Sequence, residues 1–343
     1  MKLFQYFFSG VLILWLVSCN PSPGEINLSE PISATQQPPS SDQAQIIVEV
    51  VTDNPDLNPE LPSPTDSAYS AISSTDQPES QTSVPVITKT PRPTPGIDDW
   101  QTLPVIPDVS DKVVEIYQNG LALGNDPHKF SKVGDCGSTP AWFLGDFDRG
   151  PDFYNLGDHP YLDGVIDYFQ GSFERTSLAA RSGFNASSLF SPLWSDRTFC
   201  QANESPLACE YRVHKPAIAF IMLGTNDIWK PEEFEPQMRK IVEFSIENGV
   251  IPIISTKADN AEGDHYINMI IARLAWEYEI PLLNYWRAVQ DLPDQGLQED
   301  GAHLTWGRNF FNDPQAMSKA WPVRNLTALQ ALDAVWTKIK TQD

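Results

Sequence analysis

The chain has 343 residues and a formal net charge of −22 at pH 7, from 45 acidic and 23 basic residues. So acidic a chain, without a basic patch, excludes binding to nucleic acid by phosphate neutralisation, and we expect no nucleic-acid partner. Charge of this sign keeps a protein soluble, but it does not identify a substrate.

Residues 1–19 predict an export signal. A short basic start is followed by the apolar run Leu3 to Val17, which is too short for a comfortable membrane span and fits a signal-peptide core. The ending Leu16-Val17-Ser18-Cys19 resembles the lipobox of bacterial lipoproteins. That resemblance implies an exported protein, anchored to the bacterial cell membrane by lipid on Cys19. An ordinary signal peptide or a signal anchor is the alternative.

Residues 20–99 are rich in Pro, Ser, Thr, Gln and Asp. Such a segment cannot bury enough apolar surface to offset its chain entropy, so we expect a disordered stalk. The stalk would either lift a domain off the membrane or be passive filler, and the sequence does not separate these two roles.

Residues 100–343 are expected to form one α/β domain, because helical and continuous apolar patterns alternate there. Strands that alternate with helices imply a parallel sheet covered on both faces. The predicted helices are 109–123, 161–169, 232–247, 265–279 and 326–339, and the predicted strands are 128–133, 178–183, 217–223, 250–255 and 280–284.

The turn Gly134-Asp135-Cys136-Gly137 follows the first of these strands, and an apolar segment that starts at Ala141 predicts a helix after it. A side chain at the tip of such a turn lies at the carboxyl edge of the sheet, where open α/β sheets place their sites. Near the positive end of a helix, Cys136 would favour the thiolate. The alternative is a small buried cysteine in a turn.

A second polar block, Gly-Thr-Asn-Asp at 224–227, ends the central predicted strand. The amide of Asn226 could donate to an oxyanion there. The alternative is an Asx turn in which Asp227 caps a helix.

A third block, Asp-Gly-Ala-His at 300–303, lies near the C-terminus. An aspartate three residues before a histidine in a loop can orient the ring so that it acts as a base, as Asp300 could for His303. Spacing alone does not choose this pair, because Glu262 and His265 share it.

In this order, the turn nucleophile, the glycine of Arg181-Ser182-Gly183, the Gly-Thr-Asn-Asp block and the Asp-x-x-His block resemble the SGNH (GDSL-like) hydrolase family, over roughly 130–339. The resemblance implies a three-layer α/β/α sandwich with a parallel, flavodoxin-like sheet. It also implies Gly183 and Asn226 as oxyanion donors, together with the backbone N–H of residue 136.

The same resemblance implies His303 as general base and Asp300 as its orienting partner. The chain departs from the family at the nucleophile, since the serine of the Gly-Asp-Ser turn is Cys136 here. A thiolate is a strong nucleophile, but the oxyanion hole of this family serves an oxygen. Ser138 is not a substitute, because two positions later it should face elsewhere.

The remaining cysteines can be assigned by elimination. Cys19 belongs to the lipid, and Cys200 and Cys209 lie close together in a predicted loop, 191–215, where an exported compartment permits a disulfide. Cys136 is then left as a single thiol. No Cys/His cluster has zinc spacing, so we expect no metal and no cofactor.

Three functions remain open. The first is a cell-surface esterase with a Cys136–His303–Asp300 triad, acting as a monomer on small acyl (acetyl) esters or on acylated glycans. The second is a catalytically inactive binding module, in which tryptophans could stack on sugars. The third is a thiol-based redox or acyl-transfer protein. The tryptophans considered for sugar stacking are Trp142, Trp194, Trp229 and Trp306.

Overall fold

The computed structural model describes residues 99–341. The predicted signal peptide with Cys19, and the predicted stalk up to residue 98, lie outside the described residues. Within 99–341, no helix is both long enough and apolar enough to cross a membrane.

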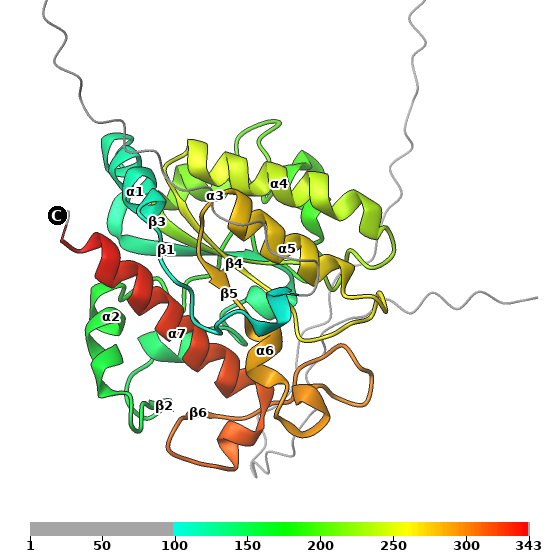
Figure 1. Cartoon of the computed structure of the whole chain (residues 1–343). Coiled ribbons are helices and arrows are strands. Elements are labelled where there is room, and N and C mark those ends of the chain that lie inside the picture. Colours follow the sequence, from blue (N-terminus) through cyan, green and yellow to red (C-terminus); the bar gives the residue numbers. More distant parts are fainter. Residues whose placement is uncertain (1–98, 342–343) are drawn as a thin grey trace, which may run out of the picture. The chain divides into compact units, whose positions relative to one another are not determined.

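A four-stranded parallel sheet in the order β1-β3-β4-β5 lies at the centre of the fold (Figure 1). Gly134 at the end of β1 is opposite Met222 of β3, and Ser255 at the end of β4 is opposite Leu283 of β5. The carboxyl ends of these strands therefore meet at one edge. The strands are β1 (Asp126–Gly134), β3 (Pro216–Met222), β4 (Ile251–Ser255) and β5 (Leu282–Leu283).

A bridge on the other side of β1 completes a flavodoxin-like arrangement. Gly134 forms an isolated parallel bridge with Ala180, on the side of β1 away from β3. The predicted strand 178–183 is thus reduced to this bridge. The spatial order of the Ala180 segment, β1, β3, β4 and β5 is the flavodoxin order 2-1-3-4-5. A separate two-stranded sheet pairs β2 (Tyr154–Asn155) with β6 (Asn309–Phe310).

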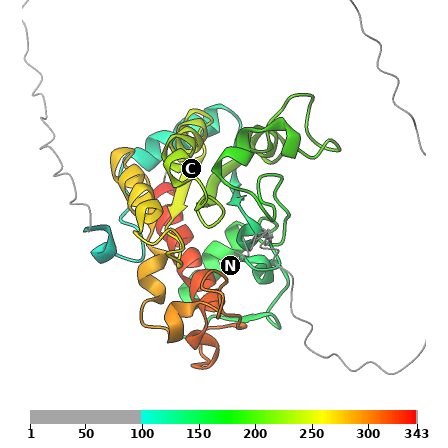
Figure 2. The same cartoon turned by 90° about the vertical axis from the view of Figure 1, so that its right-hand side faces the viewer.

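Helices lie on both faces of the main sheet and make the predicted three-layer sandwich. On one side, α7 contacts α1, α2 and α6, and on the other, α4 contacts α5 while α3 contacts β1. The red helix α7 and the orange helix α6 lie side by side in both views (Figures 1 and 2). The helices are α1 (Lys112–Ala122), α2 (Asp163–Tyr168), α3 (Pro206–His214), α4 (Pro231–Glu247), α5 (Tyr266–Glu277), α6 (Tyr285–Val289) and α7 (Ala320–Ile339). Short 3-10 helices cover 99–102, 136–138, 145–148, 160–162, 186–190, 192–194, 293–296 and 316–318.

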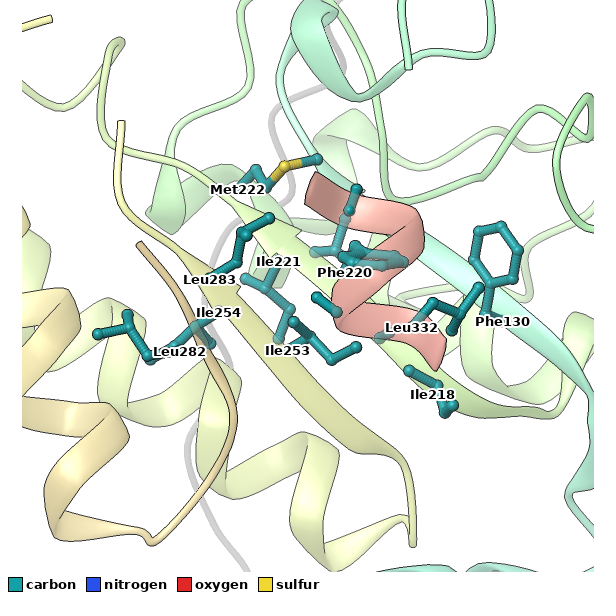
Figure 3. Packing of buried hydrophobic residues seen from close by; sticks show 14 of the residues in the cluster. Phe130, Ile218, Phe220, Ile221, Met222, Ile253, Ile254, Leu282, Leu283 and Leu332 are labelled. Atoms are coloured by element: carbon teal, nitrogen blue, oxygen red, sulfur yellow. The ribbon is translucent and has the colours of Figure 1, made fainter. Parts of the chain in front are cut away.

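The core is built on β3 and β4, all of whose residues are buried. A strand that helices cover on both faces has a continuous apolar sequence, so apolar and polar residues do not alternate in β3 and β4. The ring of Phe220 meets the rings of Phe130 and Phe143 edge-on, at centroid distances of 5.8 and 5.4 Å. Figure 3 shows Leu332 of α7 among the strand side chains.

Helix α7 begins earlier than the predicted 326. The N–H groups of Ala320 and Trp321 donate to the hydroxyl and the carbonyl of Thr305, at 3.0 and 3.1 Å. Pro322 fits the first turn, where its missing N–H costs no helical hydrogen bond. Helix α3 lies inside the region predicted as the loop 191–215, and the Ser205 side chain caps it ahead of Pro206.

Candidate active site

A cavity of about 290 Å³ opens at the carboxyl edge of the sheet. The residues that directly follow β1, β3 and β4 line it, as do the loop 298–304 and the start of α7. This is the place where open α/β sheets bind ligands. Every candidate catalytic or oxyanion residue lines this one cavity: Cys136, Gly183, Asn226, Asp300 and His303.

The turn that carries Cys136 is held close to β3. A Cβ atom on Gly134 would lie 2.2 Å from the carbonyl oxygen of Met222, so only glycine fits there. The Asp135 carboxylate accepts the N–H of Gly137 at 2.9 Å and caps a single turn of 3-10 helix. Burial raises the pKa of Asp135, against the lowering influence of Arg324.

The helix predicted after Cys136 is absent, and that prediction was wrong. Only the 3-10 turn Cys136–Ser138 follows, and Thr139 is already extended at ψ 153°. The reason is Pro140, which disfavours helical geometry in the residue before it. An α-helix N-terminus therefore does not contribute to lowering the pKa of a thiol at position 136.

The prediction that Cys136 is a single thiol was also wrong. Cys136 is disulfide-bonded in the structure, and the described residues contain no free cysteine. Ser138 does not line the cavity, and its side chain is fully buried.

Two oxyanion candidates are linked to each other. The Nδ2 atom of Asn226 donates to the carbonyl oxygen of Phe184 at 2.9 Å, and the Asp227 carboxylate accepts the N–H of Ala186 at 3.0 Å. These bonds fix the block 224–227 to the segment that carries Gly183. Gly183 has a φ of +82°, which favours glycine, and a Cβ there would meet no atom within 4 Å.

The block 224–227 also has a second support. The Thr225 hydroxyl donates to the Asp259 carboxylate at 2.8 Å, and Lys257 binds the other Asp259 oxygen at 2.6 Å. Burial raises the pKa of Asp227 to about 6, and the nearby Asp135 adds to this effect. Asp227 does not cap a helix; its carboxylate ties two loops together.

Asp300 and His303 form a hydrogen-bonded pair. Their Oδ2 and Nδ1 atoms are 2.5 Å apart, and the other Asp300 oxygen accepts the N–H groups of Ala302 and His303 at 3.0 Å. Burial acts to raise the pKa of Asp300, but the hydrogen bonds from His303 and the two backbone N–H groups win and lower it to about 2. An ionised Asp300 requires the proton of this bond on Nδ1 of the ring.

Glu262 and His265, the other acid–histidine pair at this spacing, have different partners. Glu262 accepts from Lys257 at 2.6 Å. The His265 ring packs against Trp100 and Trp286, at centroid distances of 5.7 and 5.6 Å, and does not line the cavity.

The sequence analysis missed Arg324, Trp321 and Tyr285, which line the same cavity. Arg324 is 8% exposed and lies over the rings of Phe143, Trp321 and Tyr285, 5.1 to 5.7 Å from their centroids. Burial lowers the pKa of its guanidinium, although Tyr285 and Asp135 act in the opposite direction. No sequence signal identifies this site, because the helix was predicted to begin only after Arg324.

The four tryptophans considered for sugar stacking occupy different places. Trp142 lines the cavity and stacks on Trp321 at a centroid distance of 5.4 Å. Trp194 contacts Phe184 edge-on. Trp229 and Trp306 are 81% and 62% exposed, three residues beyond Asn226 and His303 respectively.

The predicted Cys200–Cys209 disulfide is confirmed, with Cα atoms 5.3 Å apart. Cys209 lies on α3, not in a loop. These two sulfurs and Glu204 are close enough to suggest a metal site, but the sulfurs are consumed by the disulfide and Glu204 binds Arg212 at 2.7 Å.

No family model matches the chain, and no curated protein sequence matches it. Among solved structures, the acetyl xylan esterase AlAXEase is 16% identical, over 61% of this chain and 98% of its own, with a TM-score of 0.37. A GDSL-like lipase from Bacteroides thetaiotaomicron is 14% identical over 64% and 97% of the two chains, with a TM-score of 0.36. Esterase EstA from Pseudoalteromonas sp. is 14% identical over 63% and 98%, with the same TM-score. At these identities and TM-scores the likenesses assign no function, and the evidence for one lies in the site itself.

Proposed function

We propose that this chain is an exported, lipid-anchored acyl ester hydrolase with Cys136 as its nucleophile. The observation that carries the proposal is that Cys136, Gly183, Asn226, Asp300 and His303 come from separate segments of the chain and line one cavity. Nucleophile, base, orienting acid and oxyanion donors are the groups that acyl transfer requires.

His303 is the proposed general base. Ionised Asp300 holds the proton of the ring on Nδ1, which leaves Nε2 as the basic nitrogen. In the reduced protein, Nε2 takes the proton of the Cys136 thiol, and the sulfur attacks the carbonyl carbon of the ester.

Asn226 and Gly183 are the proposed donors to the oxygen that becomes negative in this attack, together with the backbone N–H of Cys136. The Asn226 amide has two N–H groups, and the bond of one to the Phe184 carbonyl orients the amide. Donors fixed before the reaction lower its barrier without reorganisation.

Collapse of the tetrahedral intermediate breaks the bond from the carbonyl carbon to the alcohol oxygen, and protonated His303 supplies the proton that the alcohol needs. A thioester on Cys136 remains. His303 then takes a proton from water, the hydroxide attacks the thioester, and the carbon–sulfur bond breaks to release the acid and restore the thiol.

The disulfide at Cys136 limits this chemistry to the reduced protein, because a sulfur bonded to another sulfur cannot attack a carbonyl. Reduction of the disulfide is therefore the first step in any assay. The proposed substrates are small acyl esters, with acetyl groups on glycans as the candidates that the family resemblance favours.

A catalytically inactive glycan-binding module is the second candidate. The exposed indole rings of Trp229 and Trp306, close in sequence to Asn226 and His303, favour it, because sugars stack on such surfaces. The disulfide at Cys136 also favours it.

An ester assay separates the two candidates. The full chain is incubated with 4-nitrophenyl acetate, with and without a phosphine reductant, beside Cys136→Ala. The proposal expects hydrolysis by reduced wild type, and only background rates for oxidised wild type and for the variant. Equal rates for reduced wild type and Cys136→Ala would remove the esterase and leave the binding module.

A further inference from the structure

Arg324 carries a buried charge that no carboxylate of the described residues binds directly. Its Nη2 atom donates to the sulfur of Met222 at 2.8 Å, and its Nε atom is enclosed and has no hydrogen-bond partner among these residues. Asp135 is close enough to influence its charge, but within residues 99–341 no carboxylate forms an ion pair with it. A buried guanidinium left in this state is costly, and an anion that reaches it is correspondingly favoured.

One edge of this guanidinium faces the cavity. The Nη1 atom has no hydrogen bond within residues 99–341 and, unlike Nε, is not fully enclosed. It lies beside the nucleophile turn, since a Cβ on Gly137 would be only 2.9 Å from it. A ligand in the cavity can therefore meet Nη1 and the tip of the turn at the same time.

The other charged groups that line the cavity already have hydrogen-bond partners. Asp259 is bound by Lys257 and Thr225, and Asp300 by His303 and two backbone N–H groups. Asp135 accepts the N–H of Gly137. Arg324 differs from them, because within residues 99–341 its one hydrogen bond goes to a neutral sulfur, that of Met222. The charge that the cavity can best accommodate is therefore negative and lies at Arg324.

We propose that Arg324 forms a carboxylate-binding subsite, and that the acyl group of the substrate carries a carboxylate, as in a half-ester of a short dicarboxylic acid. The rings of Trp321 and Tyr285 pack against the guanidinium of Arg324 and leave one of its edges open to a planar anion. Arginine suits such a site, because its guanidinium stays charged and is more weakly hydrated than the ammonium of lysine. The assignment of this carboxylate to an ester rests on the proposed function, whereas the anion binding does not.

Calorimetry with monomethyl succinate on the full chain tests the subsite without turnover, in the Cys136→Ala background and at constant ionic strength. Arg324→Met should weaken binding by on the order of tenfold or more, because the charged partner is lost. Arg308→Met is the matched control, since Arg308 also lies over one ring, that of Phe310, but is exposed and outside the cavity. It should leave binding unchanged.

Two further measurements keep the result interpretable. Arg324→Met should fold with an unchanged or higher Tm, because replacing an uncompensated buried charge by an apolar chain relieves its desolvation. Arg324→Lys covers the case in which the Met variant fails to fold, and it should also bind more weakly, since the ammonium of lysine is more strongly hydrated than a guanidinium.

Equal binding by wild type and either folded Arg324 variant would overturn the subsite. So would binding of neutral dimethyl succinate as tight as that of the monoester, or binding of inorganic sulfate with the same dependence on Arg324. Hydrolysis of 4-nitrophenyl acetate without binding of monomethyl succinate would contradict the subsite and leave the esterase proposal standing. Binding of monomethyl succinate without hydrolysis of any ester would contradict the esterase and leave the subsite standing.

Discussion

The side-chain amide of Asn226 donates a 2.9 Å hydrogen bond to the carbonyl oxygen of Phe184, and this bond joins the loop after β3 to the segment that follows the Ala180 bridge. Gly183, directly before Phe184, faces the same cavity as Asn226. One contact therefore sets the position of both proposed oxyanion donors relative to each other. It also defines the conformation of the Asn226 amide, whose second N–H is left for the cavity.

Replacing Asn226 by alanine should lower kcat by roughly 10²-fold, which is the usual cost of one oxyanion-hole donor. KM should change much less, because the donor acts on charge that develops in the transition state. Steady-state kinetics on the reduced chain measure both. The control is Asn248→Ala, which removes a side-chain bond to the Phe244 carbonyl at the end of α4. A larger effect on KM than on kcat would argue against the assigned role.

Asp227 should make folding less favourable as pH rises from about 4 to about 6. Its pKa is raised to about 6 by burial, so in this window the folded state keeps a proton that the unfolded chain has already lost. The unfolded state then binds fewer protons, and stability falls with pH. Asp227→Asn can keep the bond from Ala186 and should be more stable than wild type at pH 7 by on the order of 2–3 kcal/mol.

Urea unfolding of both proteins at pH 4 and pH 7 checks this difference. The exposed Asp313→Asn variant provides the comparison for loss of one carboxyl group. A gap between Asp227→Asn and wild type that does not grow with pH would contradict the assigned cause.

Loss of the Cys200–Cys209 disulfide should lower the free energy of unfolding by about 2–3 kcal/mol, the loop-closure value for so short a loop. The separation of the two cysteines is nine residues. The measurement compares Cys200→Ser/Cys209→Ser with its parent, both carrying Cys136→Ala so that no other disulfide changes in the described domain. Adding a reductant should destabilise the parent and leave the double variant unaffected.

The sequence was most informative where structure depends on local pattern. The run Ala217 to Leu223 predicted a buried strand, and β3 spans Pro216–Met222. Such a run is apolar because helices cover both faces of the strand, so a continuous apolar pattern predicts a strand between two layers of helices. The polar blocks also predicted that residues from separate segments meet at one edge of the sheet, because the carboxyl ends of parallel strands lie at the same edge.

The sequence was least informative where structure depends on contacts between distant segments. Helix α7 starts six residues before the predicted position, because Thr305, far back in the chain, supplies its first hydrogen bonds. Arg324 was missed for the same reason, since the rings around it come from three different segments. At Cys136, by contrast, a local signal was available: Pro140 disfavours helical geometry at Thr139, so the turn that carries Cys136 cannot continue into a helix.

The lipid anchor makes a prediction about residues outside the described region. Changing Cys19 to alanine removes the proposed site of lipid attachment, and so it should release the chain from membranes or block its processing. Membrane fractionation and electrophoretic mobility of the two proteins measure this. Identical behaviour of wild type and variant would contradict lipid anchoring and favour a plain signal peptide or a signal anchor.

The Cys136→Ser variant gives the sharpest separation of the two functions proposed for this cavity. Serine cannot form the disulfide that occupies position 136, so the variant should hydrolyse 4-nitrophenyl acetate without any reductant, while oxidised wild type does not. Its rate should equal or exceed that of reduced wild type, because the rest of the site resembles that of a serine hydrolase. His303→Ala in either background should lower the rate on the order of 10³-fold, since the base is lost.

Two other outcomes would contradict the esterase. Hydrolysis by the serine variant, with none by reduced wild type, would mean that the cavity has catalytic geometry but that a cysteine at position 136 does not support turnover. The natural protein would then be a binding module. If neither protein is active, and iodoacetamide alkylates reduced Cys136 no faster in wild type than in His303→Ala, then His303 does not act on position 136 and the proposed triad is wrong.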